Sequence, residues 1–141
     1  MSAEQAYTGG CLCGAVRYRI EEIFDAGYCH CSNCRRSTGG AVGAWAHVKA
    51  PHFELTKGEP KSHATTDAGA RDFCGECGST LYFRAADGSF HSVTIGTFDE
   101  PCRVRPKIHI CIDDGLDWLE IDDELPRYSD NRSPHPDERG V

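Results

Sequence analysis

"FCGECGSTLYF", residues 73–83, holds two cysteines separated by two residues and runs directly into a strand-like sequence. Two thiolates reach one zinc ion at about 2.3 Å only where the chain turns tightly between them, and a C-x-x-C pair forms such a turn. Gly75 and Gly78 suit the positive φ values and the close backbone approach that this turn needs. The stretch therefore predicts a zinc knuckle in which Cys74 and Cys77 are ligands.

A closed tetrahedral zinc site needs two ligands beyond those of one knuckle. Cys11 and Cys13 lie two residues apart, on or just before a strand, so their side chains point the same way and can supply them. Such a site would tie the N-terminal strand to the second half of the chain. Zinc bound there would contribute directly to the free energy of folding.

A second cysteine group lies in "YCHCSNCRRSTGG", residues 28–40. Three protein ligands with one exchangeable position are the arrangement of a catalytic zinc site, and Cys29, Cys31 and Cys34 offer three. The spacing equally allows a fourth protein ligand to close the tetrahedron. The candidates for that ligand are Cys102, Cys111, His30 and His109. In an extended segment His30 alternates away from its cysteine neighbours, so we do not count it as a ligand.

The length and the net charge of the chain indicate how many domains it forms and which classes of protein can be excluded. The 141 residues suffice for one domain, and the net charge of −7 argues against nonspecific nucleic-acid binding, which needs a basic surface. No apolar run approaches the roughly 18 residues of a membrane-spanning helix, and the N-terminus lacks the features of a signal peptide. We therefore expect a cytoplasmic protein, in which clustered cysteines, seven of the nine in the chain, bind metal or do redox chemistry rather than form disulfides.

Hydrophobic residues recur with a period of two along most of the chain, which indicates strands. Such runs are found at 16–20, 42–48, 79–98 and 108–112, and residues 52–65 are interpreted as two short strands around the turn-forming residues 57–60. Asp87-Gly88 lies between two runs and predicts a hairpin, whereas only the acidic stretch 113–125 suggests a helical turn. The pattern predicts a mainly β, largely antiparallel single domain over residues 6–128, followed by a polar, disordered tail at 129–141.

The cysteine motifs and their flanks resemble those of one known family. "GGCLCGAVRY", "CHCSNCRRSTGG", "FCGECGSTLYF" and "PKIHICIDDGLDWLEIDDELPRY" together resemble the glutathione-dependent formaldehyde-activating enzymes, which include centromere protein V-like members. The resemblance covers nearly the whole chain up to Tyr128. It implies an Mss4-like fold of coiled antiparallel sheets stapled by zinc, with two zinc ions per chain, the second one labile.

The resemblance also implies ligands and an activity. The structural zinc would be held by Cys11, Cys13, Cys74 and Cys77, and the second by Cys29, Cys31 and Cys34. The reaction would be that of a carbon–sulfur lyase of the S-(hydroxymethyl)glutathione synthase type, which joins the glutathione thiol to formaldehyde or a related small carbonyl compound. A non-enzymatic zinc-stapled module that binds a protein partner, and a redox or zinc sensor, are the competing hypotheses.

Three thiolates and one Zn²⁺ carry a net charge of −1, and a substrate thiolate would make it −2, so a nearby cation would help. Arg35 and Arg36 follow Cys34 directly; one could neutralise the site and the other could pair with a substrate carboxylate, or both could be solvated loop residues. Ser37, Thr38 and the glycines Gly39 and Gly40 could offer hydroxyl and N–H groups to the substrate, although turn formation explains them as well.

Five further residues receive an interpretation from sequence. His109 shares a strand face with Cys111 and is a candidate proton carrier, although a hydrogen-bonded structural histidine is the commoner case. Cys102 and Cys111 are interpreted as small buried residues, and Trp45 and Trp118 as core or lid packing.

Overall fold

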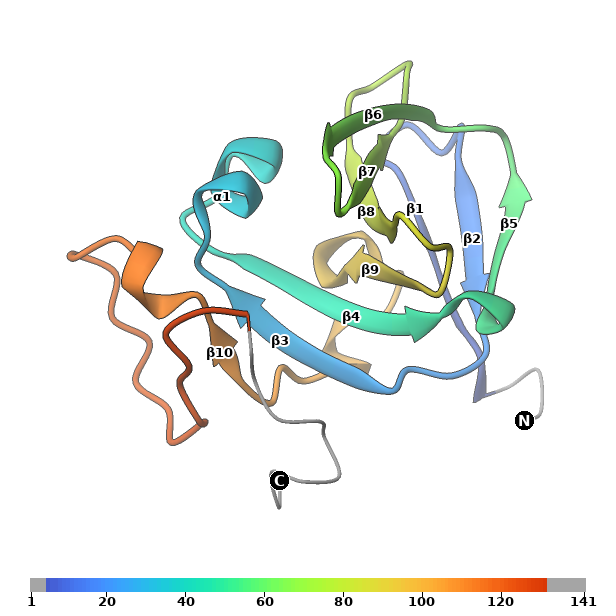
Figure 1. Ribbon diagram of the computed structural model, residues 1–141. Helices are drawn as coiled ribbons and strands as arrows, with labels where there is room; N and C mark the ends of the chain where they lie inside the picture. The colour runs from blue at the N-terminus through green and yellow to red at the C-terminus, as the bar shows by residue number, and fades with distance from the viewer. Residues whose placement is uncertain (1–4, 132–141) are drawn as a thin grey trace.

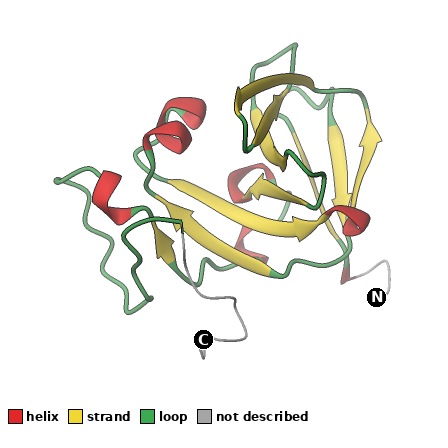
Figure 2. Cartoon of the chain, viewed as in Figure 1, coloured by secondary structure: helices red, strands yellow, loops and turns green. Residues whose placement is uncertain are grey.

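Short strands make up most of the regular structure, as the alternating pattern predicts (Figures 1 and 2). The computed structural model describes residues 5–131. The strands are β1 Tyr7–Gly10, β2 Arg17–Ile20, β3 Asp25–Cys29, β4 Gly43–Lys49, β5 Phe53–Lys57, β6 Lys61–Thr66, β7 Gly69–Phe73, β8 Thr80–Ala85, β9 Phe90–Thr94 and β10 His109–Ile110. The helices are α1 Ser32–Thr38 and the short 3-10 helices Ala50–His52, Ile95–Thr97, Pro101–Arg103 and Ile112–Asp114.

The strands form two sheets. A three-stranded sheet has the order β1-β2-β5, and a seven-stranded sheet has the order β10-β3-β4-β9-β8-β7-β6. All strand pairs are antiparallel except β10 with β3, which is parallel. The predicted mainly β, single-domain fold is therefore confirmed.

The predicted strands and the predicted hairpin can be compared with the structure one by one. In β2, Tyr18 and Ile20 are buried while the intervening arginines are half-buried, as period two requires. The Asp87-Gly88 hairpin joins β8 to β9, with Gly88 in the left-handed region at φ 74°. The two strands predicted on either side of residues 57–60 are β5 and β6. They do not pair with each other but belong to different sheets.

The strand expected over residues 108–112 is shorter than its isoleucine pattern suggests. It ends at Ile110 because Cys111 takes a left-handed conformation, with φ 57° and ψ 37°, that redirects the chain into the 3-10 helix Ile112–Asp114. Alternation of hydrophobic residues predicts pairing partners but carries no signal for a single left-handed residue, so the pattern overestimated this strand.

A short helix, α1, occupies the segment that the sequence analysis treated as a loop. Cys31 is its N-cap, and the sulfur of Cys31 accepts a hydrogen bond from the backbone N–H of Cys34 at 3.3 Å. At the other end Gly39 is a left-handed C-cap with φ 74°. Cysteine is not among the residues that usually mark an N-cap, which explains why the sequence did not reveal this helix.

The main hydrophobic core lies where the two sheets meet. Ile20, Ala46, Val48, Leu81 and Val93 have no exposed surface and belong to one cluster. A second, smaller cluster contains Cys29, Cys34 and Trp45, so the core function expected for Trp45 is confirmed, and Trp45 also reaches the second cysteine group. Trp118, in contrast, is 69% exposed, so its predicted packing role is wrong.

The last described segment is hydrogen-bonded to the fold. The carbonyl oxygens of Ser129 and Asp130 accept hydrogen bonds from the backbone N–H groups of Asp113 and Cys111, respectively. These first residues of the predicted tail are therefore part of the folded structure, and the prediction for 132–141 lies outside the described residues. Within the described chain, no helix has the length and apolar character needed to cross a membrane.

Leu81 offers a direct test of the core. Replacing it with alanine (Leu81→Ala) should lower the free energy of unfolding by about 2–5 kcal/mol, because a fully buried side chain is lost and leaves a cavity. Urea denaturation followed by circular dichroism measures the change. Leu55→Ala is the matched control, since Leu55 is 37% exposed and should cost far less. Equal losses in the two variants would contradict this description of the core.

Candidate metal centres and the adjoining cleft

Four cysteines from two distant turns converge on one point. Their sulfur atoms, those of Cys11, Cys13, Cys74 and Cys77, lie within 4.8 Å of one another. The sulfurs of Cys11 and Cys13 are 3.7 Å apart, and those of Cys13 and Cys74 are 3.8 Å apart. This is the ligand set predicted for a structural metal site, and four soft thiolate donors suit zinc.

The local turn chemistry holds these sulfurs in place. Backbone N–H groups point at them: that of Val16 donates to Cys11 at 3.2 Å, and that of Glu76 donates to Cys74 at 3.4 Å. Gly14 and Gly78 each have a φ of 81°. Donors aimed at sulfur stabilise the thiolate form, which is the form that binds metal.

Two details of the predicted knuckle need correction. Cys11 and Cys13 meet through a turn between β1 and β2, not through strand alternation, since the backbone N–H of Gly14 donates to the carbonyl of Cys11 at 3.2 Å. Gly78 has the expected positive φ, whereas Gly75 is not among the positive-φ glycines. Gly75 instead allows the side chain of Lys61 to approach closely.

The second group is formed by Cys29, Cys31 and Cys34, whose sulfur atoms also lie within 4.8 Å of one another. Cys29 is the last residue of β3 and is held between β4 and β10, where it pairs with Gly43 and Ile110. Cys31 and Cys34 face each other across the first turn of α1, with their sulfurs 3.2 Å apart. The predicted division of the seven cysteines into four and three therefore matches the geometry.

The three thiols do not titrate alike. Side-chain hydrogen bonds from Cys29 and Cys34 lower the pKa of Cys31 despite its partial burial, and the backbone N–H of Cys34 and the charge of Arg71 add to the effect. Hydrogen bonds with Cys29 and Cys31 raise the pKa of Cys34.

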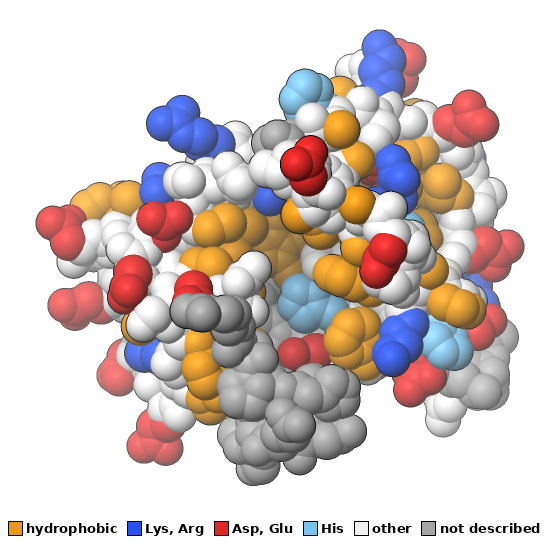
Figure 3. Space-filling view, viewed as in Figure 1, with side chains coloured by type: hydrophobic (Ala, Val, Ile, Leu, Met, Phe, Trp, Pro, Cys, Tyr) orange, Lys and Arg blue, Asp and Glu red, His pale blue; other side chains and the backbone are white. Residues whose placement is uncertain are grey.

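The three-cysteine group opens onto a cleft of about 570 Å³. Figure 3 shows a hollow with hydrophobic side chains between the surface over α1 and the surface over β6–β8. Its apolar lining consists of Phe24, Trp45, Phe83, Phe90, Ile108 and Ile110. His47, Asp25 and Asn33 are among its polar residues. A cleft of this size can hold a molecule of the size of a small peptide beside the sulfurs.

Arg71, on β7, lines this cleft and was not found by the sequence analysis. Its guanidinium carbon lies 5.7 Å from the ring centroid of Trp45 and 5.5 Å from that of Phe83. One of its nitrogens donates to the hydroxyl of Ser37 at 3.2 Å. Arg71 is far from the cysteine triplet in sequence, so no local spacing connects them; only its position just before the Cys74 knuckle gave a hint.

The residues that follow Cys34 do not lie where the sequence analysis expected them. Arg35 and Arg36 are not among the residues that line the cleft, and Arg35 donates to the carbonyl of Asp114 at 3.3 Å. The hydroxyls of Ser37 and Thr38 donate to the carbonyl of Cys34 at 3.2 and 2.9 Å. With Gly39 as the C-cap, these residues complete α1; contact with a substrate stays a prediction for them.

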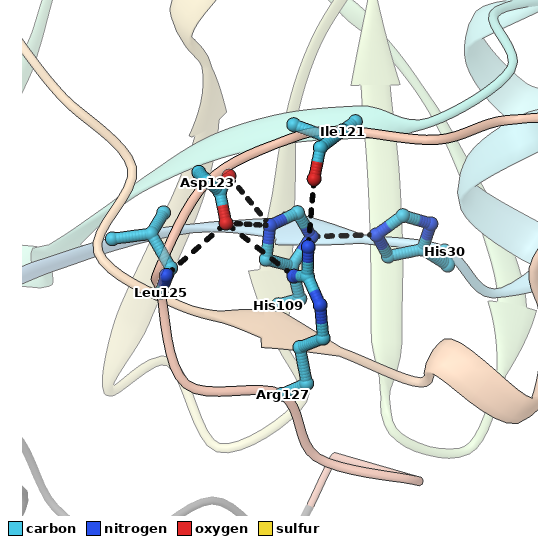
Figure 4. Close-up of polar contacts among 6 residues, drawn as sticks. All are labelled: His30, His109, Ile121, Asp123, Leu125 and Arg127. Carbon is cyan, nitrogen blue, oxygen red and sulfur yellow. Dashed lines mark hydrogen bonds and ion pairs between the residues drawn. The ribbon is translucent and has the colours of Figure 1, made fainter.

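His30, His109 and Asp123 form a chain of hydrogen-bonded side chains (Figure 4). Nε2 of His30 is 2.8 Å from Nδ1 of His109, and Nε2 of His109 is 2.9 Å from a carboxylate oxygen of Asp123. His109 is only 1% exposed. It is therefore a buried, hydrogen-bonded histidine, and neither imidazole lines the cleft.

Of the four candidates for a fourth ligand, Cys111 is the one that lines the cleft together with the triplet. It lines the cleft and packs against the cluster of Cys29 and Cys34, but it falls outside the compact three-sulfur group. Cys102 is exposed, which corrects its interpretation as a buried residue, while Cys111 is half-buried. The triplet therefore faces the cleft with Cys111 beside Cys29, and an open fourth position stays a prediction.

Comparison with known proteins agrees with this geometry. The glutathione-dependent formaldehyde-activating enzyme family matches residues 6–114. An uncharacterized lyase of Schizosaccharomyces pombe is 30% identical over 133 residues, covering 87% of this chain and 90% of the yeast protein. A Halomonas elongata protein, provisionally named as a glutathione-dependent formaldehyde-activating enzyme, is 27% identical over 129 residues, covering 81% of this chain and 80% of its own.

A solved structure supports the fold. The crystal structure of a Rhodobacter sphaeroides protein superposes with a TM-score of 0.56, covering 85% of this chain and 98% of that chain at 21% identity. The chain belongs to the glutathione-dependent formaldehyde-activating enzyme family. Its two cysteine groups could each bind a metal ion, and their donor sets are consistent with zinc.

The two groups should respond differently to loss of a ligand. Cys74→Ser should abolish binding of one metal ion and lower the free energy of unfolding by on the order of 4 kcal/mol, because metal binding at a site that joins distant turns is folding energy. Cys31→Ser should also lose one metal but cost about 1 kcal/mol or less, since serine is itself a good N-cap. Metal analysis and urea denaturation measure both effects.

The controls for this pair are two further cysteines. Cys102→Ser, at an exposed position, should keep both metals and full stability. Cys111→Ser should keep both metals as well, because three thiols hold the second ion without it. Loss of one metal in Cys111→Ser would show that the site is closed by a fourth thiolate, and unchanged metal content in Cys31→Ser would refute the division of ligands.

Proposed function

We propose that this protein is a zinc-dependent enzyme of the carbon–sulfur lyase type, which adds a small thiol, with glutathione as the first candidate, to formaldehyde or a related small carbonyl compound. The observation that carries the proposal is that three convergent thiols form part of the wall of an open cleft, whereas the other four form a compact group between two turns. The family of the chain and the names of its relatives support the same chemistry.

Cys29, Cys31 and Cys34 would hold the zinc of the active site, and Cys11, Cys13, Cys74 and Cys77 would hold a structural zinc. A zinc ion on three thiolates, when bound, supplies a position that keeps an incoming thiol in its deprotonated, nucleophilic form. With three protein thiolates and an exchangeable fourth position, this site would release its metal more readily than the four-thiol site. A reducing cytoplasm would keep all seven thiols available.

The reaction needs no oxidant or reductant. The substrate sulfur attacks the carbonyl carbon, a carbon–sulfur bond forms, and the π electron pair of the carbonyl moves to oxygen, which takes up a proton. His47 lines the same cleft, and its Nδ1 lies 2.8 Å from the hydroxyl oxygen of Ser92, so His47 is our candidate for the group that supplies that proton. The aromatic lining limits access of water, which strengthens the electrostatic interactions of the thiolate with its surroundings.

The test of this function is exchange NMR of glutathione and formaldehyde with and without the zinc-loaded protein. The wild type should accelerate formation and breakdown of the adduct above the spontaneous rate. Cys31→Ser should return the rate to background, and Cys102→Ser should behave like the wild type. If zinc-loaded wild type leaves the spontaneous rate unchanged, the proposed enzyme function is wrong and the protein-binding module becomes the better hypothesis.

His47 can be tested in the same assay. His47→Gln should slow exchange by about 100-fold or more, the usual contribution of a positioned acid or base, while thiol affinity changes little. Its effect should shrink as buffer concentration is raised, because a small buffer acid can replace the imidazole. A rate that is unchanged at low buffer concentration would exclude His47 from proton transfer.

A further inference from the structure

The side chain of Arg71 is fixed in one position by contacts with two aromatic rings and by a hydrogen bond. Its guanidinium lies over two aromatic rings, those of Trp45 and Phe83, and donates to Ser37 on α1. Ser37 in turn donates to the carbonyl of Cys34, so Arg71 is linked to the turn that carries the cysteine triplet. Stacking and this hydrogen bond reduce the entropy that the side chain would lose on binding a ligand.

Arg71 also lacks an acidic partner within residues 5–131. The arginines Arg17, Arg84, Arg103 and Arg127 each form an ion pair with Asp or Glu, but no such pair is found for Arg71 in that part of the chain. A guanidinium has five N–H donors, and Arg71 uses one of them on Ser37. Asp25 also lines the cleft, but no ion pair joins it to Arg71 among the described residues, and a half-buried, prepositioned guanidinium of this kind is suited to bind an anion.

We propose that Arg71 binds a carboxylate of the thiol substrate, so that the cleft selects thiols that carry a carboxylate over neutral thiols of the same size. This inference rests on the proposed function, because it places the substrate sulfur at the cysteine triplet. Both groups line one cleft of about 570 Å³, and the apolar wall between them suits the methylene groups that join sulfur to carboxylate. Glutathione meets this requirement, as does a much smaller mercapto acid.

Two other assignments predict different behaviour. If Arg71 serves only as a counter-charge for the thiolates, its loss weakens acidic and neutral thiols alike. If Arg36 binds the carboxylate, as its place next to Cys34 suggested, selectivity depends on Arg36 instead. Arg36 is exposed on α1 and is absent from the lining of the cleft, which favours Arg71.

The experiment compares 3-mercaptopropionate with its methyl ester, which has the same thiol and chain but no charge. Dissociation constants are measured by calorimetry on zinc-loaded wild type, Arg71→Met, Arg71→Lys, Arg36→Met and Arg105→Met. The ratio of the two constants is compared between variants, so the intrinsic acidity of each thiol cancels. Metal content and circular dichroism confirm that each variant is folded and loaded.

The wild type should bind the acid more tightly than the ester, and Arg71→Met should reduce this preference by roughly tenfold or more while the affinity for the ester stays within about twofold. Arg71→Lys should keep part of the preference, because the charge remains but the two-pronged geometry is lost. Arg36→Met and Arg105→Met should resemble the wild type, Arg105 being an exposed arginine outside the cleft lining.

The experiment distinguishes failure of the Arg71 assignment from failure of the proposed function. If both thiols bind but Arg71→Met weakens them equally, or if the preference is lost in Arg36→Met instead, the assignment of Arg71 is wrong and the thiol-binding function stands. If neither thiol binds to the zinc-loaded wild type, the proposed function and the role of Arg71 are both overturned.

Discussion

The convergence of Cys11, Cys13, Cys74 and Cys77 is the constraint on which the rest of the structure depends. The first pair lies in the turn between β1 and β2, and the second in the turn between β7 and β8, so the group joins the small sheet to the large one. A hydrogen bond from the backbone of Leu12 to the hydroxyl of Ser79 connects the same two turns. Because β7 ends at this group, the group also fixes the position of the strand that carries Arg71.

The wall of the cleft that contains the cysteine triplet is held in place by other interactions. There Cys29 is fixed by pairing of β3 with β4 and β10, and the other two cysteines are fixed by the first turn of α1. Gly43 lies opposite Cys29 and leaves no room for a side chain beside Trp45. One wall of the cleft thus contains β7, which ends at the four-cysteine group. The other wall contains the cysteine triplet, which is positioned by the pairing of β3 and by the N-terminal cap of α1. The two chemical groups of the cleft, the triplet and Arg71, come one from each wall.

Local spacing was enough to predict the cysteine groups and most strands, because a turn or an alternating pattern is encoded by residues a few positions apart. What the sequence could not provide depends on contacts between distant segments. Arg71 reaches the triplet only because β7 and α1 meet in space, and Arg36, although adjacent to Cys34, lies outside the cleft lining. The left-handed Cys111 and the Cys31 cap are local, but neither uses the residue type that normally signals such a conformation.

The two cysteine groups differ in how their negative charge is compensated, and this difference separates structure from function. In the four-cysteine group, backbone N–H groups of the two turns point at the sulfurs and are part of the fold itself. In the triplet, backbone N–H groups of Cys34 and Cys31 are hydrogen-bonded to the sulfurs of Cys31 and Cys29, and a further positive charge comes from the side chain of Arg71. Backbone N–H groups are fixed by the fold and stay with the sulfurs. A guanidinium near thiolates, in contrast, has further N–H groups that can donate to the carboxylate of a bound substrate. In the proposed reaction, the substrate thiolate would go to the metal on the triplet, and the substrate carboxylate would go to Arg71, which lines the same cleft. Selectivity should accordingly come from the arginine and reactivity from the cysteines.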